Sequence, residues 1–416
     1  MKITKNDLFS LPRKNGIVMH VDMNSYFASC EQQANPAWRG KPLGVCSYLH
    51  PKGTLIAASI EAKKMGIKTG TKVWEARLKC PSIVLVRDEP DKYRIITRRL
   101  RKIFESYSSG VSNYSIDESF LKFSDLDIDL PESRNEILKK AQEIKSRIGE
   151  EVGEWLKCSI GISSTMFFAK IASDYQKPDG LTVIDKNNVD LILNNLELLD
   201  IWGISWGLKR RLNSLGIFSP LNIKYTKPSF LFKKMGKIGY FLWSRLNGLE
   251  IDNLTTREKK GEKSIGHSYT LIKKTEDKKT LSLLLLKLCE KIGRRLRKSR
   301  KVAKVCWLAW TYVYGGGFGR QEKMAKATDD SWEIFQVIYK NVKNKLLAGK
   351  ISKIFISVSG LEDKKIQLSL LSDELKKDRL VRSMDIINDR YGDFTLVRGG
   401  LSNWSEEISD RVAFGN

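Results

Sequence analysis

The chain has 416 residues, of which 41% are hydrophobic and 29% charged, as is usual for globular proteins. The formal net charge of +25 favours a polyanionic partner, although a lysine-rich composition alone gives the same excess. The longest apolar run is too short to span a bilayer, the N-terminus has no signal-peptide core, and the six scattered cysteines indicate no disulfide framework or zinc site. We therefore expect a cytoplasmic protein and no membrane partner.

The first 184 residues mix short β runs with helical patterns, which is typical of an α/β or α+β fold. The apolar run GIVMHVD reads as a buried strand, and a helical pattern follows it directly. We expect strands at 16–22, 42–48, 53–58, 82–86, 111–123 and 158–163, and helices at 25–33, 61–65, 91–107, 131–151 and 166–175.

Residues 187–249 carry only helical patterns. Within them, residues 199–217 predict a helix, a tight turn at Gly203 to Ser205, and a second helix that ends at Gly216. This arrangement is typical of a helix-hairpin-helix, which holds a DNA backbone through main-chain N–H groups. Ser205 stands where a second glycine is usual, and a plain αα-hairpin remains an alternative.

A polar stretch at 249–262 reads as a linker to a third unit. There we expect helices at 281–296 and 330–347 and strands at 302–314 and 351–359, compatible with a small sheet covered by two helices. The end of its first helix is strongly basic. A solvated helix face is the ordinary explanation, but in so basic a chain we expect a DNA-binding surface formed by Arg294, Arg295, Arg297, Lys298 and Arg300.

Adjacent carboxylates, Asp117 and Glu118, lie in the strand-like run NYSIDESFLKF. Neighbouring strand residues point to opposite faces, so both cannot simply face solvent on a half-buried strand. Asp22 supplies a third carboxylate at the end of GIVMHVD, where open sheets commonly bind ligands. Three oxygen ligands favour Mg²⁺, and two such ions would serve phosphoryl transfer. The alternative is a turn aspartate beside an exposed glutamate.

The residues after Asp22 lead from a strand into a helix, where backbone N–H groups of Ser25, Tyr26 and Phe27 could hold a triphosphate. Lys63 and Lys177 could add positive charge for the phosphates. Lysines are frequent throughout this chain, so neither residue alone is specific evidence for a nucleotide site.

With these residues in view, HVDMNSYFASCE (20–31) and YSIDESFL (114–121) resemble the two acidic motifs of Y-family, translesion DNA polymerases. Segments 56–70, 159–180, 199–217, 263–270, 354–361 and 384–392 also resemble this family, in the right order along nearly the whole chain. The resemblance implies an α+β multidomain, right-hand polymerase. Its parts would be a palm (1–24 and 88–185), small fingers (25–87), a helical thumb (186–248), a linker (249–262), a little finger (263–405) and a tail (406–416).

The resemblance also assigns roles to residues of this chain. It implies two Mg²⁺ ions held by Asp22, Asp117, Glu118 and the carbonyl of Met23. Phe27 matches the steric gate that excludes a ribose 2′-hydroxyl, and Lys177 matches a phosphate-binding lysine. The fingers of the family usually present a tyrosine and an arginine, where this chain has Ile60 and Lys63.

The segment Gln367-Leu368-Ser-Leu370-Leu371 resembles the sliding-clamp-binding pentapeptide QLSLF, with leucine in place of the final phenylalanine. An extended segment of this kind would insert its leucines into a pocket of the clamp. The alternative is an ordinary strand of the last domain.

We therefore expect a low-fidelity, damage-tolerant DNA polymerase that binds primer–template DNA, a dNTP and a sliding clamp, and that is a monomer by itself. The resemblance further implies a part in the SOS response to DNA damage. One competing hypothesis is a catalytically weak, DNA-binding or clamp-associated scaffold derived from such a polymerase. Another is a different Mg²⁺ enzyme on DNA, such as a nuclease, although Phe27 would then have no purpose as a gate.

Overall fold

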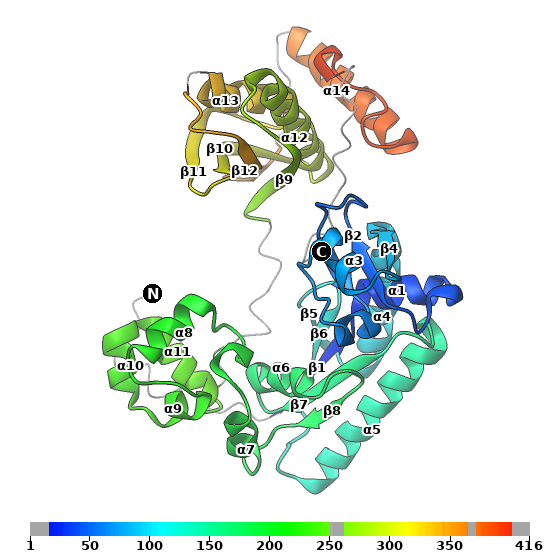
Figure 1. Ribbon diagram of the computed structural model, residues 1–416, viewed down its shortest axis with the longest axis vertical. Helices are drawn as coiled ribbons and strands as arrows, with labels where there is room; N and C mark the ends of the chain where they lie inside the picture. The colour runs from blue at the N-terminus through cyan, green and yellow to red at the C-terminus, as the bar shows by residue number, and fades with distance from the viewer. Residues whose placement is uncertain (1–15, 250, 252–261, 344, 365–371, 402–416) are drawn as a thin grey trace. The chain divides into compact units, whose positions relative to one another are not determined.

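A computed structural model describes residues 16–249, 251, 262–343, 345–364 and 372–401 of the chain (Figure 1). Contacts between residues divide the chain into two compact units, residues 1–257 with 409–416, and residues 258–408. Each unit is described by itself below. The expected clamp-binding segment, Gln367 to Leu371, lies outside the described residues. Among those that are described, no helix is long and apolar enough to cross a membrane.

The first unit is built on a five-stranded sheet with the order β5-β6-β1-β7-β8. Neighbouring strands are antiparallel except β7 and β8, which are parallel. The strands are β1 (Ile17–Met23), β5 (Gly110–Asn113), β6 (Glu118–Phe123), β7 (Cys158–Ser163) and β8 (Leu181–Val183).

Strand β1 is central and buried on both faces, which explains its continuous apolar sequence. Ile17, Met19 and Val21 belong to a core shared with α1 (Tyr26–Ala34), α4 (Pro90–Tyr107) and α5 (Pro131–Arg147). Val18 packs with Met166 of α6 (Met166–Tyr175), and His20 Nδ1 lies 2.7 Å from Ser173 Oγ of the same helix. The alternation places Asp22 on the α6 face of the sheet.

The predicted strand at 111–123 is wrong as a single element. Strands β5 and β6 form a hairpin, and residues 114–117 make the turn between them. The backbone N–H groups of Tyr114 and Ser115 both donate to the carbonyl of Glu118, at 3.0 and 3.2 Å, which closes this turn. Asp117 therefore lies in the turn, whereas Glu118 is the first residue of β6.

The first unit also contains a three-stranded sheet with the order β3-β2-β4. Its strands are β2 (Leu43–Cys46), β3 (Leu55–Ala58) and β4 (Val84–Arg87), and its helices are α2 (Ile60–Lys64) and α3 (Val73–Lys79). Helix α3 had no counterpart among the predicted elements. Buried Leu55, Ala62, Val73 and Ala76 give this part a small core of its own.

Residues 187–249 are helical, as predicted, in α7 (Val189–Asn194), α8 (Trp206–Asn213), α9 (Pro220–Tyr225), α10 (Pro228–Met235) and α11 (Lys237–Leu246). The expected first helix of the hairpin is wrong, because residues Leu198–Asp200 form a single 3-10 turn. The chain then turns at Gly203, whose φ of 95° favours glycine. Phe167 and Phe168 of α6 pack into the same core as these helices.

The second unit contains a four-stranded sheet with the order β11-β10-β12-β9, to which the short β13 (Glu362–Asp363) adds. Its strands are β9 (Ser264–Thr275), β10 (Lys301–Tyr312), β11 (Gly317–Thr328) and β12 (Ile351–Ser359). Two helices, α12 (Lys278–Lys298) and α13 (Ser331–Lys343), pack against it, as predicted. Strands β9, β11 and β13 and the later helix α14 (Ser372–Tyr391) were not predicted.

Candidate active site

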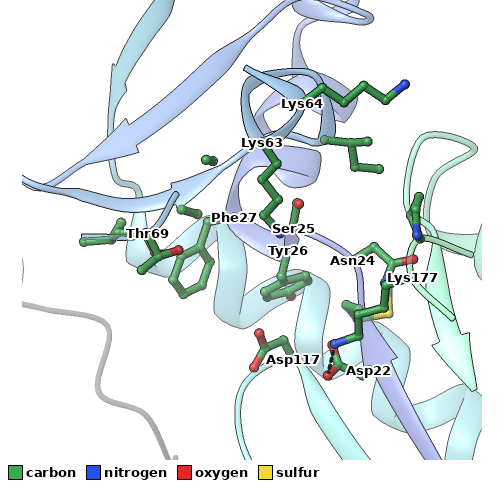
Figure 2. Close-up of a pocket in the computed structure, with 16 residues that line it drawn as sticks. Asp22, Asn24, Ser25, Tyr26, Phe27, Lys63, Lys64, Thr69, Asp117 and Lys177 are labelled. Atoms are coloured by element: carbon green, nitrogen blue, oxygen red, sulfur yellow. Dashed lines mark hydrogen bonds and ion pairs between the residues drawn. The ribbon is translucent and has the colours of Figure 1, made fainter. Parts of the chain in front are cut away.

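A pocket of about 590 Å³ opens where β1 ends and α1 begins (Figure 2). Residues from β1, α1, the β3–α2 segment and the two loops at 117 and 177 line it. Of the residues expected to form the site, the pocket gathers Asp22, Met23, Ser25, Tyr26, Phe27, Ile60, Lys63, Asp117 and Lys177. Chain segments that are far apart in sequence therefore converge on one cavity.

The strand register explains how the carboxylates come together. Asp22 of β1 and Glu118 of β6 are directly opposite each other on neighbouring antiparallel strands. The backbone N–H of Met23 donates to the carbonyl of Asp117 at 3.0 Å, so the turn is tied to the end of β1. Opposed residues on one sheet face have side chains close enough to interact. The sheet thus holds all three acidic residues at one end.

Asp22 is paired with a cation in this structure. Its Oδ2 accepts from Lys177 Nζ at 2.8 Å, and Lys177 also pairs with Asp174 at 2.7 Å. Burial raises the pKa of Asp22 to about 6, and the Lys177 charge opposes that rise. Burial works to lower the pKa of Lys177, but the charges of Asp22 and Asp174 outweigh it and raise that pKa.

The other two carboxylates have different partners. Glu118 forms an ion pair with Lys170 of α6, a residue whose side chain is 11% exposed. The carboxylate of Asp117 accepts from the hydroxyl of Ser115. Burial raises the pKa of Asp117 and outweighs that hydrogen bond, and the nearby Asp22 adds to the rise. Of the three, Asp117 thus has the weakest electrostatic compensation.

The described residues contain no group of three or more His, Cys, Asp or Glu side chains already gathered as metal ligands. The donor set nevertheless fits a hard divalent cation, because Asp22, Asp117 and Glu118 lie at the same end of the sheet and a cation would offset the cost of burying the charges of Asp22 and Asp117. The lysine ion pairs at Asp22 and Glu118 supply positive charge here. A bound cation would have to replace these pairs in part.

Phe27 forms one wall of the pocket and is 5% exposed. Its ring stacks on Tyr93 of α4, with ring centroids 4.5 Å apart and an angle of 24° between the planes. The Tyr93 hydroxyl donates to Glu31 at 2.7 Å, and Lys92 pairs with the same carboxylate at 2.8 Å. The ring of Phe27 is therefore supported from behind by α4 and cannot recede easily.

The N-terminus of α1 faces the same pocket. Ser25 takes a left-handed conformation there, with φ at 49°, and its Oγ is buried without a hydrogen-bond partner within the described part of the chain. Figure 2 shows the Lys63 side chain next to Ser25. Burial, with the nearby charge of Lys177, lowers the pKa of Lys63. Unpaired donors and two lysines around a helix N-terminus suit an anion.

The expected DNA contacts lie outside this pocket. Gly203 and Ser205 lie in the turn before α8, and Ser205 is its N-cap without a side-chain cap hydrogen bond. In the second unit, Arg295, Lys298 and Arg300 are exposed. Arg294 pairs with Asp389 and Asp393, and Arg297 with Asp385 at 2.6 Å. Arg294 and Arg297 thus pair with residues of α14 and with Asp393 just after it.

Sequence reasoning missed two residues of the site, Lys170 and Tyr93. Lys170 lies within one turn of Phe167 on α6, whose residues 166–173 are all buried, so the one lysine in this apolar run was a signal of a buried partner. Tyr93 lies in the helix 91–107, where it reads as a core residue. Only the strand register and the packing of α4 reveal that these side chains support Glu118 and Phe27.

Two models of one family match the chain. The impB/mucB/samB family matches residues 21–174, and its C-terminal domain matches residues 262–370. A solved Y-family DNA polymerase chimera is similar in structure, with a TM-score of 0.71 and 26% identity over 83% of this chain and 99% of that chain. The chain belongs to the impB/mucB/samB family of Y-family DNA polymerases.

Relatives with a curated name point the same way. The chain is 29% identical to the DNA polymerase IV of Acetivibrio thermocellus, over 92% of this chain and 97% of the relative. It is 28% identical to DNA polymerase IV 2 of Bacillus subtilis, over 96% and 98% of the two chains. The similarity extends over nearly the full length of both relatives.

Proposed function

We propose that the chain is a template-directed DNA polymerase of low fidelity that copies past damaged bases. The reaction is the attack of a primer 3′-hydroxyl on the α-phosphate of a dNTP, with release of pyrophosphate. The observation that carries this proposal is the meeting of Asp22 and Glu118, directly opposed on β1 and β6, beside a pocket lined by Phe27, Lys63 and Lys177.

Asp22, Asp117, Glu118 and the carbonyl of Met23 would hold two Mg²⁺ ions. Bound there, the ions supply the charge that favours loss of the hydroxyl proton and stabilises the leaving pyrophosphate. The carboxylates fix the positions of that charge, because β1, β6 and the 114–117 turn hold them in one register. Lys177 leaves Asp22 and becomes available to the triphosphate, which carries the opposite charge.

The remaining pocket residues bind and orient the nucleotide. The backbone at Ser25, Tyr26 and Phe27 and the unpaired Ser25 hydroxyl offer donors to phosphate oxygens. Lys63 adds a charge without the fork of an arginine, and Ile60 adds no hydroxyl, so this contact is weaker than a tyrosine–arginine pair. Phe27, backed by Tyr93, excludes a ribose 2′-hydroxyl.

Primer extension with purified protein tests the proposal. Extension that needs Mg²⁺, a template and dNTPs, and that continues past a damaged template base, is the expected result. A protein that binds primer–template DNA but never extends it supports the scaffold hypothesis. Degradation of the primer would instead support a nuclease.

DNA binding is proposed for two surfaces, the turn at Gly203 to Ser205 and the basic end of α12. Main-chain N–H groups in the turn and exposed cations on α12 would follow phosphates without reading bases. Because Arg294 and Arg297 are paired with aspartates, Arg295, Lys298 and Arg300 are the stronger candidates on α12.

A sliding clamp is the proposed protein partner. Changing Gln367, Leu370 and Leu371 to alanine is expected to abolish clamp pull-down and to spare clamp-independent extension. Retained pull-down would contradict a clamp-binding role for this segment. A cytoplasmic location, action as a monomer and induction in the SOS response remain predictions of the same proposal.

A further inference from the structure

Lys170 of α6 lies between the proposed metal site and the helical part of the first unit. Its ammonium group pairs with Glu118, and its side chain is 11% exposed. The same Nζ lies 5.4 Å from the ring centroid of Tyr114 and 5.9 Å from that of Trp202. Lys170 therefore has two kinds of partner at once, a carboxylate and a pair of aromatic rings.

The two rings form a fixed support. Tyr114, in the β5–β6 turn, meets Trp202 edge to face, with centroids 5.7 Å apart and an angle of 87° between the planes. Trp202 is half-buried, packs against the core of α7 to α11, and stacks at 6.3 Å on Phe167 of α6. The face of an aromatic ring attracts a cation, and this attraction does not require a carboxylate partner. Trp202 also carries Arg245, at 5.3 Å from its centroid, so Lys170 shares that ring and has Tyr114 as its nearer aromatic partner when Glu118 is not paired with it.

This arrangement answers a problem that the proposed function raises. A buried lysine whose partner carboxylate is taken by a metal ion would be left as an unpaired charge in a poorly solvated place. If the lysine were simply absent, Glu118 would be an unpaired carboxylate whenever no ion is bound. A cation that pairs with Glu118 in one state and rests on Tyr114 and Trp202 in the other avoids both costs.

We propose that Lys170 is a positioning residue that holds Glu118 before a divalent cation binds and is then retained by Tyr114 and Trp202. The inference rests on the proposed function, since it takes Glu118 as a metal ligand. Lys170 competes with the incoming cation for one carboxylate, whereas Trp202 lowers the cost of its release. The two side chains therefore act on cation affinity with opposite signs.

Mn²⁺ binding to the full chain, without DNA or nucleotide, measures this directly through the electron paramagnetic resonance signal of free Mn²⁺. Lys170→Met removes the competitor, so Mn²⁺ is expected to bind about tenfold more tightly, equivalent to about 1.4 kcal/mol. Trp202→Leu removes one resting partner, so binding is expected to weaken about threefold. Lys170→Arg keeps the charge and is expected to bind Mn²⁺ as the unchanged protein does.

The double variant separates this role from a merely structural one. Trp202 acts through Lys170, so Trp202→Leu is expected to change Mn²⁺ affinity little in the Lys170→Met background. Loss of Mn²⁺ affinity in Lys170→Met, or an undiminished effect of Trp202→Leu in the double variant, overturns the inference. If Lys170→Met does not fold, Lys170→Gln replaces it. Tighter Mn²⁺ binding by Lys170→Gln is expected, and weaker or unchanged Mn²⁺ binding would contradict the inference.

Asp117→Ala distinguishes a failure of this inference from a failure of the proposed function. Its Mn²⁺ binding is expected to fall below detection, because one of the proposed carboxylate ligands is lost. If Asp117→Ala binds Mn²⁺ like the unchanged protein, the cation site itself is misplaced. If Asp117→Ala loses binding but Lys170→Met does not gain it, only the role of Lys170 is wrong.

Discussion

The carboxylates at the ends of β1 and β6 and the basic run at the end of α12 are both dense clusters of charge, but their surroundings differ. The carboxylates line or adjoin an open pocket, and two of them have lysine partners that a metal ion could replace. In the basic run, Arg297 is held by two oxygens of Asp385 and by the carbonyl of Asp329, and its side chain is 10% exposed. An ion pair that a ligand could replace, next to a cavity, is typical of a ligand-binding site. An arginine whose partners all belong to the fold, such as Arg297, is typical of a structural role.

The largest expected effect comes from removing a carboxylate at the pocket. Asp117→Ala or Glu118→Ala is expected to reduce the primer-extension rate at least about a thousandfold, the factor given by about 4 kcal/mol of lost transition-state stabilisation. DNA affinity should stay close to that of the unchanged protein in a binding assay. Full extension by either variant would show that the metal site lies elsewhere.

Removing Arg297 tests the structural side of the comparison. Arg297→Met leaves Asp385 and the Asp329 carbonyl without their partner, so the free energy of unfolding should fall by about 3 kcal/mol in urea denaturation. Exposed Lys298→Met is the matched control, with a change within about 0.5 kcal/mol. Equal stability of the two variants would mean that the Asp385 pair contributes nothing, and that Arg297 is free for another partner.

Substitutions at Phe27 test the proposed selection of the sugar within the pocket. Phe27→Ala is expected to raise ribonucleotide incorporation relative to deoxyribonucleotide incorporation at least about tenfold, because the ring proposed to exclude the 2′-hydroxyl is lost from the pocket wall. Phe27→Tyr keeps the ring and should keep the discrimination. Steady-state incorporation of matched rNTP and dNTP pairs measures both variants, and an unchanged ratio in Phe27→Ala places the gate at another residue.

The smallest effect should come from the exposed cations of α12. Replacing Arg295, Lys298 and Arg300 by glutamine is expected to weaken DNA binding at every sequence. The slope of log affinity against log salt should flatten by about 0.9 for each phosphate that the protein no longer neutralises. Fluorescence anisotropy at several salt concentrations gives the slope. An unaltered slope would mean that Arg295, Lys298 and Arg300 do not contact DNA. Their role would then be structural, like that of Arg297.

Several of the residues singled out from the sequence line one pocket, whereas some of the elements around them were predicted wrongly or not at all. Asp22 and Phe27 lie on a strand and a helix that short-range patterns reveal, and both line the pocket. The strand at 111–123 was wrong because a closing turn at residues 114–117 looks β-like in a run of Tyr, Ser and Ile. Strand β11 was missed because charged and polar residues occur on both of its faces and no apolar stripe runs along it.

Long-range partners could not be predicted. Lys170 meets Glu118 only because α6 crosses the face of the sheet on which Glu118 stands, and nothing near residue 170 identifies this partner. The pairing of Arg294 and Arg297 with Asp385, Asp389 and Asp393 likewise depends on α14, a helix absent from the predicted elements. A run of like charges shows where cations are, whereas the opposing charges decide what they do.

If Phe27 excludes a ribose 2′-hydroxyl as proposed, its stack on Tyr93 makes Tyr93 a second position that sets the room left for the sugar. Since α4 backs the gate ring, trimming Tyr93 to leucine would let Phe27 slide back by a fraction of its width without removing it. Substitutions at Tyr93 would therefore widen the proposed sugar site in small increments for bulky 2′-substituted nucleotides, and would leave the ring of Phe27 itself in place.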